Sequence, residues 1–227
     1  MQRNLASAKL NLKFKNPKIL EQTFIHRSYL NEVRLDIPSN ERLEFLGDSV
    51  LSLIVSFELF LRRVNDAEGN LTNLRAYIVK TKSLAQAAKK LELGKYLLLS
   101  KGEELSGGRK NQQILANTYE ALIGAIFLDQ GIESVKQFID TTLLALFEKE
   151  LKIGPPKDSK SFLQEIVQEK FHESPRYETL ETIGPDHAKQ FFVAVRFGGK
   201  EFGKGKGSSK QEAEEEAAKK ALDLLNA

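Results

Sequence analysis

The stretch that most constrains the fold of this chain is residues 152–158, which read Lys-Ile-Gly-Pro-Pro-Lys-Asp. Glycine favours the end of a helix, and two consecutive prolines cannot continue one because they lack the backbone N–H and fix φ. Before this stretch the apolar residues recur at the 3.6-residue helical period, and after it part of the chain alternates with the two-residue period of strands. We therefore expect two domains, residues 1–152 and 159–227, joined by a linker at residues 153–158.

The first domain is expected to be all-α. The apolar spacing predicts helices over residues 17–29, 41–63, 71–80, 83–91, 112–128 and 133–151. Ser39 or Asn40 is expected to cap the second of these helices. Glu41 would then lie in its first turn, where the helix dipole favours a negative charge.

The second domain is expected to be a small α+β domain of order α-β-β-β-α. Its helices are predicted over residues 161–171 and 209–225, and its strands over residues 176–181, 189–197 and 200–203. Gly198 and Gly199 indicate the hairpin between the last two strands. Alanines repeat along one face of the last helix, which predicts close packing of that face against the sheet.

Composition excludes several classes of protein. The chain has no cysteine, which rules out disulfides, thiolate zinc sites and cysteine nucleophiles, and its three histidines lie too far apart to suggest a metal cage. The N-terminal segment lacks the apolar core of a secretory signal, and no apolar stretch approaches the roughly 20 residues needed to span a bilayer. We therefore expect a cytoplasmic protein that does not bind membranes.

Charge by itself does not identify a partner. The net charge is +3, and residues 158–227 contain 11 basic and 13 acidic residues. Neither part is basic enough to predict nucleic-acid binding, so such a prediction must rest on local patches. The acidic run of Glu212, Glu214, Glu215 and Glu216 in the last helix is expected to face solvent.

Three carboxylates lie on one strip of the helix that starts near residue 41. Glu41, Glu44 and Asp48 have the spacing i, i+3 and i+7, which places them within about 60° of one another around the helix. Like charges this close repel, and Mg²⁺, which prefers carboxylate and water oxygens, would relieve the repulsion. The spacing is equally compatible with a solvated acidic face whose counter-charge is Arg42.

A second polar pair lies in an otherwise apolar helix. Asn117 and Glu120 have the spacing i and i+3, and the small residues Gly124 and Ala125 would let another backbone come close. Two helices carrying oxygen ligands could therefore meet around one metal ion. The alternative is a buried polar pair whose hydrogen bonds are made by an arginine or by the backbone.

Four segments resemble those of a known family. The segment NERLEFLGDSVL at residues 40–51 resembles the signature helix of the ribonuclease III family, and ANTYEALIGAIFLDQG at residues 116–131 resembles its second catalytic helix. The segments HRSY at residues 26–29 and GEELSGGR at residues 102–109 are similar to other blocks of the same endonuclease domain. Residues 158–227 resemble a double-stranded RNA-binding domain, so the resemblance covers essentially the whole chain in its bacterial two-domain form.

This resemblance implies an endonuclease that cuts double-stranded RNA, including ribosomal and messenger RNA precursors, and leaves 5′-phosphate and 3′-hydroxyl ends. It implies that Asp48 and Glu120 are catalytic, that Glu44, Asn117 and Glu120 bind Mg²⁺ or Mn²⁺, and that Glu41 is an outer acidic residue. The family usually has aspartate where this chain has Asn117, and a neutral amide oxygen should bind the metal more weakly.

The resemblance also implies a homodimer. Phe45 lies off the apolar stripe of its helix, and it is similar to an aromatic residue of the family that enters a socket on the partner subunit. A symmetric dimer would place two acidic sites along one RNA groove, one for each strand. Packing of Phe45 in the core of its own subunit is the alternative.

In the second domain the resemblance implies three groups of RNA contacts. Gln164 and Glu165 on the first helix would reach one minor groove, and His187 would enter a second. Lys206, Ser209 and Lys210 would bind phosphates near the start of the last helix. Gln211 stands where the family often has a lysine.

Two other functions remain open at this point. The chain could be a catalytically weak or inactive double-stranded RNA-binding or ribosome-assembly protein, which the asparagine at position 117 favours and the full set of four carboxylates opposes. It could also be a DNA nuclease, although the second domain resembles one that detects A-form helices and 2′-hydroxyl groups.

Overall fold

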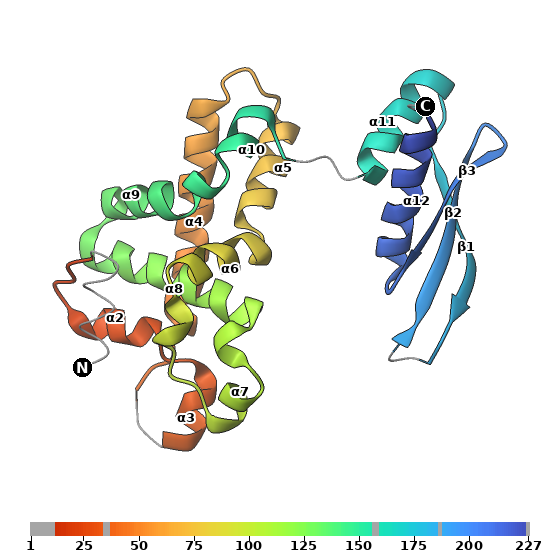
Figure 1. The fold of residues 1–227 in the computed structure, drawn as a ribbon. Coiled ribbons are helices and arrows are strands. Elements are labelled where there is room, and N and C mark those ends of the chain that lie inside the picture. The colour runs from red at the N-terminus through yellow and green to blue at the C-terminus, as the bar shows by residue number, and fades with distance from the viewer. Residues whose placement is uncertain (1–11, 34–36, 156–158, 186–187, 226–227) are drawn as a thin grey trace. The chain divides into compact units, whose positions relative to one another are not determined.

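The computed structural model describes residues 12–33, 37–155, 159–185 and 188–225. The chain divides into two compact units, residues 1–155 and 156–227 (Figure 1). The first is helical, and the second has three antiparallel strands and two helices, which confirms the predicted fold class. Each unit is described by itself.

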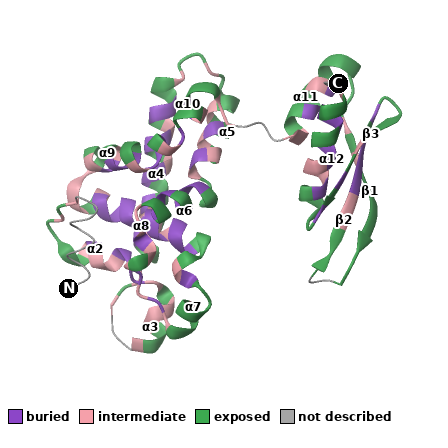
Figure 2. Cartoon of the chain, in the orientation of Figure 1, coloured by how far each residue is buried: buried purple, intermediate pink, exposed green. Residues whose placement is uncertain are grey.

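The first unit consists of short helices arranged around two long ones. The long helices are α4 (Glu41–Arg62) and α8 (Gln112–Gln130). The others are α2 (Pro17–Thr23), α3 (Arg27–Val33), α5 (Glu68–Val79), α6 (Thr81–Lys90), α7 (Lys101–Leu105), α9 (Ile132–Thr142) and α10 (Glu148–Ile153), with 3-10 turns η1 (Leu93–Lys95), η2 (Gly108–Lys110) and η3 (Leu144–Leu146). Helix α8 runs through the core and is buried over most of its surface, as Figure 2 shows.

The backbones of α4 and α8 touch where two glycines face each other. A Cβ atom on Gly47 of α4 would overlap the carbonyl oxygen of Glu120, and one on Gly124 of α8 would overlap the carbonyl oxygen of Leu43. Any larger residue at either position would push the helices apart. This contact determines which faces of α4 and α8 lie side by side.

Two predicted helices are interrupted, and one predicted cap is wrong. The helix expected over residues 17–29 breaks because His26 N–H donates to Leu98 O and Leu98 N–H donates to Phe24 O. The helix expected over residues 133–151 is interrupted at residues 143–147. Of the two predicted caps of α4, Asn40 is wrong, because its side chain is buried and its Nδ2 donates to Thr23 O at 3.1 Å. The Oγ atom of Ser39 instead accepts a hydrogen bond of 3.4 Å from Glu41 N–H.

The second unit packs two helices on one face of a three-stranded sheet of order β1-β2-β3. Its elements are α11 (Ser159–Phe171), β1 (Arg176–Ile183), β2 (Gln190–Phe197), β3 (Lys200–Gly207) and α12 (Lys210–Leu225). Strand β3 continues to Gly207, four residues beyond the prediction. Its glycines pack against α12, and a Cβ atom on Gly205 would overlap Ala213 O. A glycine-rich sequence that is typical of loops is therefore part of a strand.

Candidate active site and RNA-binding surface

The contact between α4 and α8 brings the predicted carboxylates into one region. Gly47 lies between Glu44 and Asp48 along α4 and touches the backbone of Glu120 on α8. The charges of Asp48 and Glu44 raise the pKa of Glu120 by coulombic repulsion, so these carboxylates are close enough to Glu120 to interact with it. The contact between α4 and α8 therefore brings Glu44, Asp48 and Glu120 into one region.

Glu120 is the least solvated of these acids. Burial is the main cause that raises its pKa to about 7, and the charges of Asp48 and then Glu44 add to the effect. Its carboxylate makes no hydrogen bond or ion pair with any residue that the structure describes. A partly buried carboxylate in this position is stabilised either by a proton or by a cation.

Glu44 interacts with the neighbouring polar residue of α8. Burial raises the pKa of Glu44, and the charge of Glu41 raises it further, whereas a hydrogen bond from Asn117 lowers it. The Oδ1 atom of Asn117 accepts a hydrogen bond of 2.7 Å from Gln113 Nε2. The amide nitrogen of Asn117 therefore faces Glu44, and its oxygen is already bonded. Sequence reasoning missed Gln113, one helical turn before Asn117.

An open cavity of about 910 Å³ adjoins this region. Glu41, Glu44 and Asn117 line it together with residues from the segment at 26–31. The Glu41 carboxylate accepts a hydrogen bond of 2.9 Å from Ser39 Oγ and lies 3.7 Å from the exposed guanidinium of Arg27. Glu41 and Glu44 thus both line the cavity, whereas Glu120 lies at the contact between α4 and α8.

The residue types fit a divalent metal ion, although their side chains are not gathered around one point. In the described ranges, no group of three or more His, Cys, Asp or Glu side chains is arranged to hold an ion. Coulombic repulsion favours side-chain conformations that keep like charges apart. The unpartnered Glu120 carboxylate beside two others is nevertheless the kind of oxygen donor set that binds Mg²⁺ or Mn²⁺.

Phe45 is 78% exposed on α4, as expected from its place off the apolar stripe. The outer face of α4 carries further exposed apolar residues, Leu53, Phe57, Phe60 and Leu61, and exposed Val64 follows just after the helix. A hollow of about 450 Å³ lies between this face and α5 and is lined in part by Phe57, Phe60 and Leu71. An apolar face this long on one helix is typical of an interface with another protein.

In the second unit the predicted RNA-binding residues lie on three elements. Gln164 and Glu165 are exposed on α11, and Lys206 is exposed at the end of β3. Ser209 directly precedes α12, which begins at Lys210. His187 lies outside the described residues.

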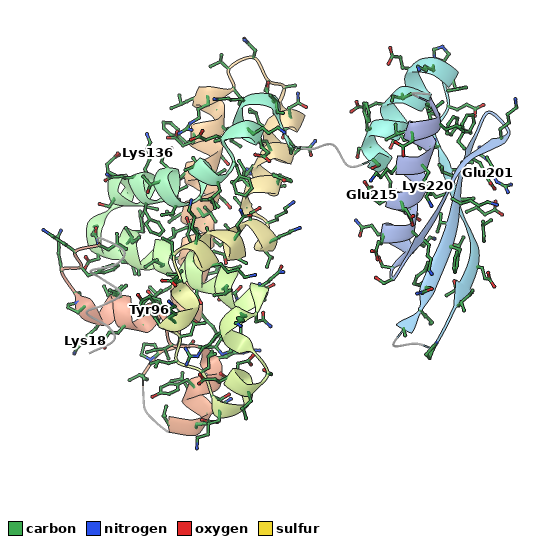
Figure 3. The ribbon with its side chains drawn as sticks, in the orientation of Figure 1. Lys18, Tyr96, Lys136, Glu201, Glu215 and Lys220 are labelled. Carbon is green, nitrogen blue, oxygen red and sulfur yellow. The ribbon has the colours of Figure 1, made fainter. Side chains whose placement is uncertain are left out.

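The acidic run of α12 does not simply face solvent, so that expectation is wrong. Glu215, labelled in Figure 3, accepts a hydrogen bond from Ser159 N–H, and Glu214 pairs with Lys160 at 2.6 Å. Glu216 accepts a hydrogen bond from Lys206 N–H near the end of β3, and Glu212 accepts one from Ser208 N–H just after that strand. Helix periodicity cannot detect these bonds because their partners belong to other elements.

Comparison with known proteins agrees with this architecture. The family model described as ribonuclease-III-like matches residues 16–146, and that of the double-stranded RNA binding motif matches residues 159–225. Ribonuclease 3 of Roseiflexus sp. is 45% identical over 96% of this chain and 94% of its own length. Ribonuclease 3 of Geobacillus kaustophilus is 46% identical over 96% and 89%.

A solved structure shares the fold of the first unit. It is the nuclease domain of ribonuclease III from Campylobacter jejuni, which is 39% identical with a TM-score of 0.59 and covers 63% of this chain and 96% of that one. The description of that structure refers to flexibility in a region involved in dimer formation.

Fold and comparisons together define a helical nuclease domain followed by a double-stranded RNA-binding domain. The chain belongs to the ribonuclease III family. It is accordingly an endoribonuclease of double-stranded RNA, from a family whose nucleases generally depend on a metal ion. Among the described residues, no helix is both long and apolar enough to cross a membrane.

Proposed function

We propose that this chain cleaves double-stranded RNA with Mg²⁺, or alternatively Mn²⁺, bound by Glu44, Glu120 and Asn117, and that Asp48 and Glu120 are the catalytic pair. The products would carry 5′-phosphate and 3′-hydroxyl ends. The observation that carries the proposal is the Glu120 carboxylate, which is partly buried, repelled by Asp48 and Glu44, and without a partner among the described residues.

The bound metal would activate a water molecule and stabilise the charge that develops on the leaving 3′ oxygen. Glu120 must lose its proton to act as a ligand, so metal binding should release a proton near neutral pH. Glu44 adds charge on the cavity side, and Glu41 extends the acidic surface towards the cavity. Asn117 can contribute its amide oxygen only if that oxygen leaves Gln113 Nε2.

The second domain would hold the duplex. Gln164, Glu165 and His187 are proposed to contact minor grooves, which display 2′-hydroxyl groups in RNA. Lys206, Ser209 and Lys210 are proposed to bind phosphates. Ribosomal and messenger RNA precursors in the cytoplasm are the proposed substrates.

A second copy of this chain is the proposed partner of the exposed apolar face of α4. Phe45 would enter a hollow on the other subunit, and the two acidic sites would each cut one strand. Light scattering should give the mass of a dimer. Replacing Phe57 and Phe60 by glutamate should give a monomer, and a wild-type monomer at micromolar concentration would contradict the proposal.

One cleavage assay tests the function. The protein is incubated with double-stranded RNA, single-stranded RNA or double-stranded DNA, with Mg²⁺ or with EDTA. We expect cleavage of double-stranded RNA alone, only with Mg²⁺, and none by Glu120→Gln even at saturating Mg²⁺. Binding of RNA without cleavage by the wild type would favour the inactive alternative, and cleavage by Glu120→Gln would refute the role of Glu120.

A further inference from the structure

Two carboxylates of α12 bond to the segment of residues 206–210, which runs from the end of β3 into α12 and carries the proposed phosphate ligands. The Oε2 atom of Glu212 accepts hydrogen bonds from Ser208 N–H at 2.8 Å and from Ser208 Oγ at 2.6 Å. The Oε2 atom of Glu216 accepts one from Lys206 N–H at 2.6 Å. Hydrogen bonds to a charged acceptor are about twice as strong as those between neutral groups. These bonds lower the pKa of both carboxyl groups.

The connection between β3 and α12 is too short for residues 206–210 to adopt many backbone conformations. Strand β3 ends at Gly207 and α12 begins at Lys210, so only Ser208 and Ser209 connect them. Ser209 Oγ accepts a hydrogen bond from Glu212 N–H at 3.2 Å, which completes a reciprocal arrangement like a capping box. Side chains of α12 therefore determine the backbone conformation of residues 206–210, which include Lys206, Ser209 and Lys210.

Negative charges beside a phosphate site would be expected to weaken RNA binding, because affinity for nucleic acid depends strongly on charge. Here both carboxylates are directed at the protein's own N–H and O–H donors. Glu216 is also paired with Lys220 at 2.9 Å. The arrangement indicates that these acids shape the segment rather than oppose RNA.

We propose that Glu212 and Glu216 are positioning residues for RNA binding, which hold residues 206–210 in the conformation that presents Lys206, Ser209 and Lys210 to consecutive phosphates. This inference rests on the proposed role of those three residues. It leads to a counterintuitive expectation, namely that removing a negative charge from this surface lowers the affinity for RNA.

The test compares Glu212→Gln and Glu216→Gln with the matched control Glu214→Gln. Glutamine keeps the shape of the side chain but removes the charge. Each of the three variants loses one negative charge from α12. Glu214, however, is paired with Lys160, and among the described residues it makes no hydrogen bond to residues 206–210. Affinity for an RNA duplex of about 20 base pairs, longer than one such domain covers, is measured in EDTA at several salt concentrations.

If the acids position the segment, Glu212→Gln and Glu216→Gln should bind more weakly, on the order of tenfold when combined. For these two variants, the slope of log affinity against log salt concentration should be shallower than for the wild type, because fewer phosphates are contacted. Glu214→Gln should bind as tightly as the wild type or more tightly. Melting curves of each variant show whether the second domain remains folded, and Glu212→Asp should recover part of the affinity.

Tighter binding by Glu212→Gln and Glu216→Gln, with an unchanged salt dependence, would overturn the inference. The variants Lys206→Ala and Lys210→Ala test the proposed phosphate surface independently of the positioning role of the two glutamates. If the lysine variants weaken binding but the glutamine variants do not, only the positioning role fails. If the lysine variants have no effect, the proposed phosphate surface is wrong and the inference fails with it.

Discussion

Replacing Glu120 by glutamine should stabilise the metal-free protein while it abolishes cleavage. In the folded protein the Glu120 carboxyl has a pKa of about 7 in place of 4.5, mainly because it is buried and then because Asp48 and Glu44 repel its charge. Folded protein therefore retains this proton up to about pH 7, whereas unfolded chains release it near pH 4.5. The contribution of protonated Glu120 to the free energy of unfolding is therefore fully present below about pH 4.5 and is lost as the pH rises through 7.

The size of the effect follows from the two pKa values. Each pKa unit corresponds to about 1.4 kcal/mol, which gives an upper limit of about 3.4 kcal/mol for charging Glu120 in the folded state. Part of the side chain remains in contact with water, and screening reduces this to about 2 kcal/mol. For a domain of this size, that free energy corresponds to a rise in melting temperature of about 4–8 °C at pH 8.

Thermal unfolding in EDTA, followed by circular dichroism at pH 5 and pH 8, measures the effect. Glu120→Gln should melt about 4–8 °C higher than the wild type at pH 8 and about 1–2 °C higher at pH 5. Glu58→Gln is the matched control, because Glu58 on α4 is also a buried carboxylate but is paired with Arg62 and Lys136, so its loss should lower the melting temperature. A stabilisation by Glu120→Gln that is equal at both pH values, or absent at pH 8, would refute the reasoning.

Two further changes test the site. Asn117→Asp should lower the Mg²⁺ concentration for half-maximal rate, with each tenfold change worth about 1.4 kcal/mol, and should lower the melting temperature in EDTA because it adds a carboxylate beside Glu44. If neither quantity moves, Asn117 does not contact the metal. Gly47→Ala should greatly reduce cleavage, because the added methyl group overlaps Glu120 O and separates α4 from α8. Wild-type activity and stability in this variant would mean that the close helix contact does not position the carboxylates.

The sequence by itself determined the class of each domain and suggested the residues of the proposed site. Helical and strand periods are local properties, so the change of period near residue 154 was sufficient to predict a helical domain followed by an α-β-β-β-α domain. Local spacing also placed Glu41, Glu44 and Asp48 on one strip of a helix and Asn117 and Glu120 on another.

Tertiary structure decided how those strips meet and how each group is solvated. The glycine contact between α4 and α8 brings the backbone of Glu120 to α4 between Glu44 and Asp48, and burial in the folded protein raises the pKa of Glu120. The side chain of Asn40 leaves its helix end for Thr23 O, seventeen residues away. Glu216 bonds to Lys206 in β3 and Glu212 to Ser208 just after it, although these acids were predicted to face solvent. Such contacts depend on the packing of whole elements, and periodicity within one element carries no information about them.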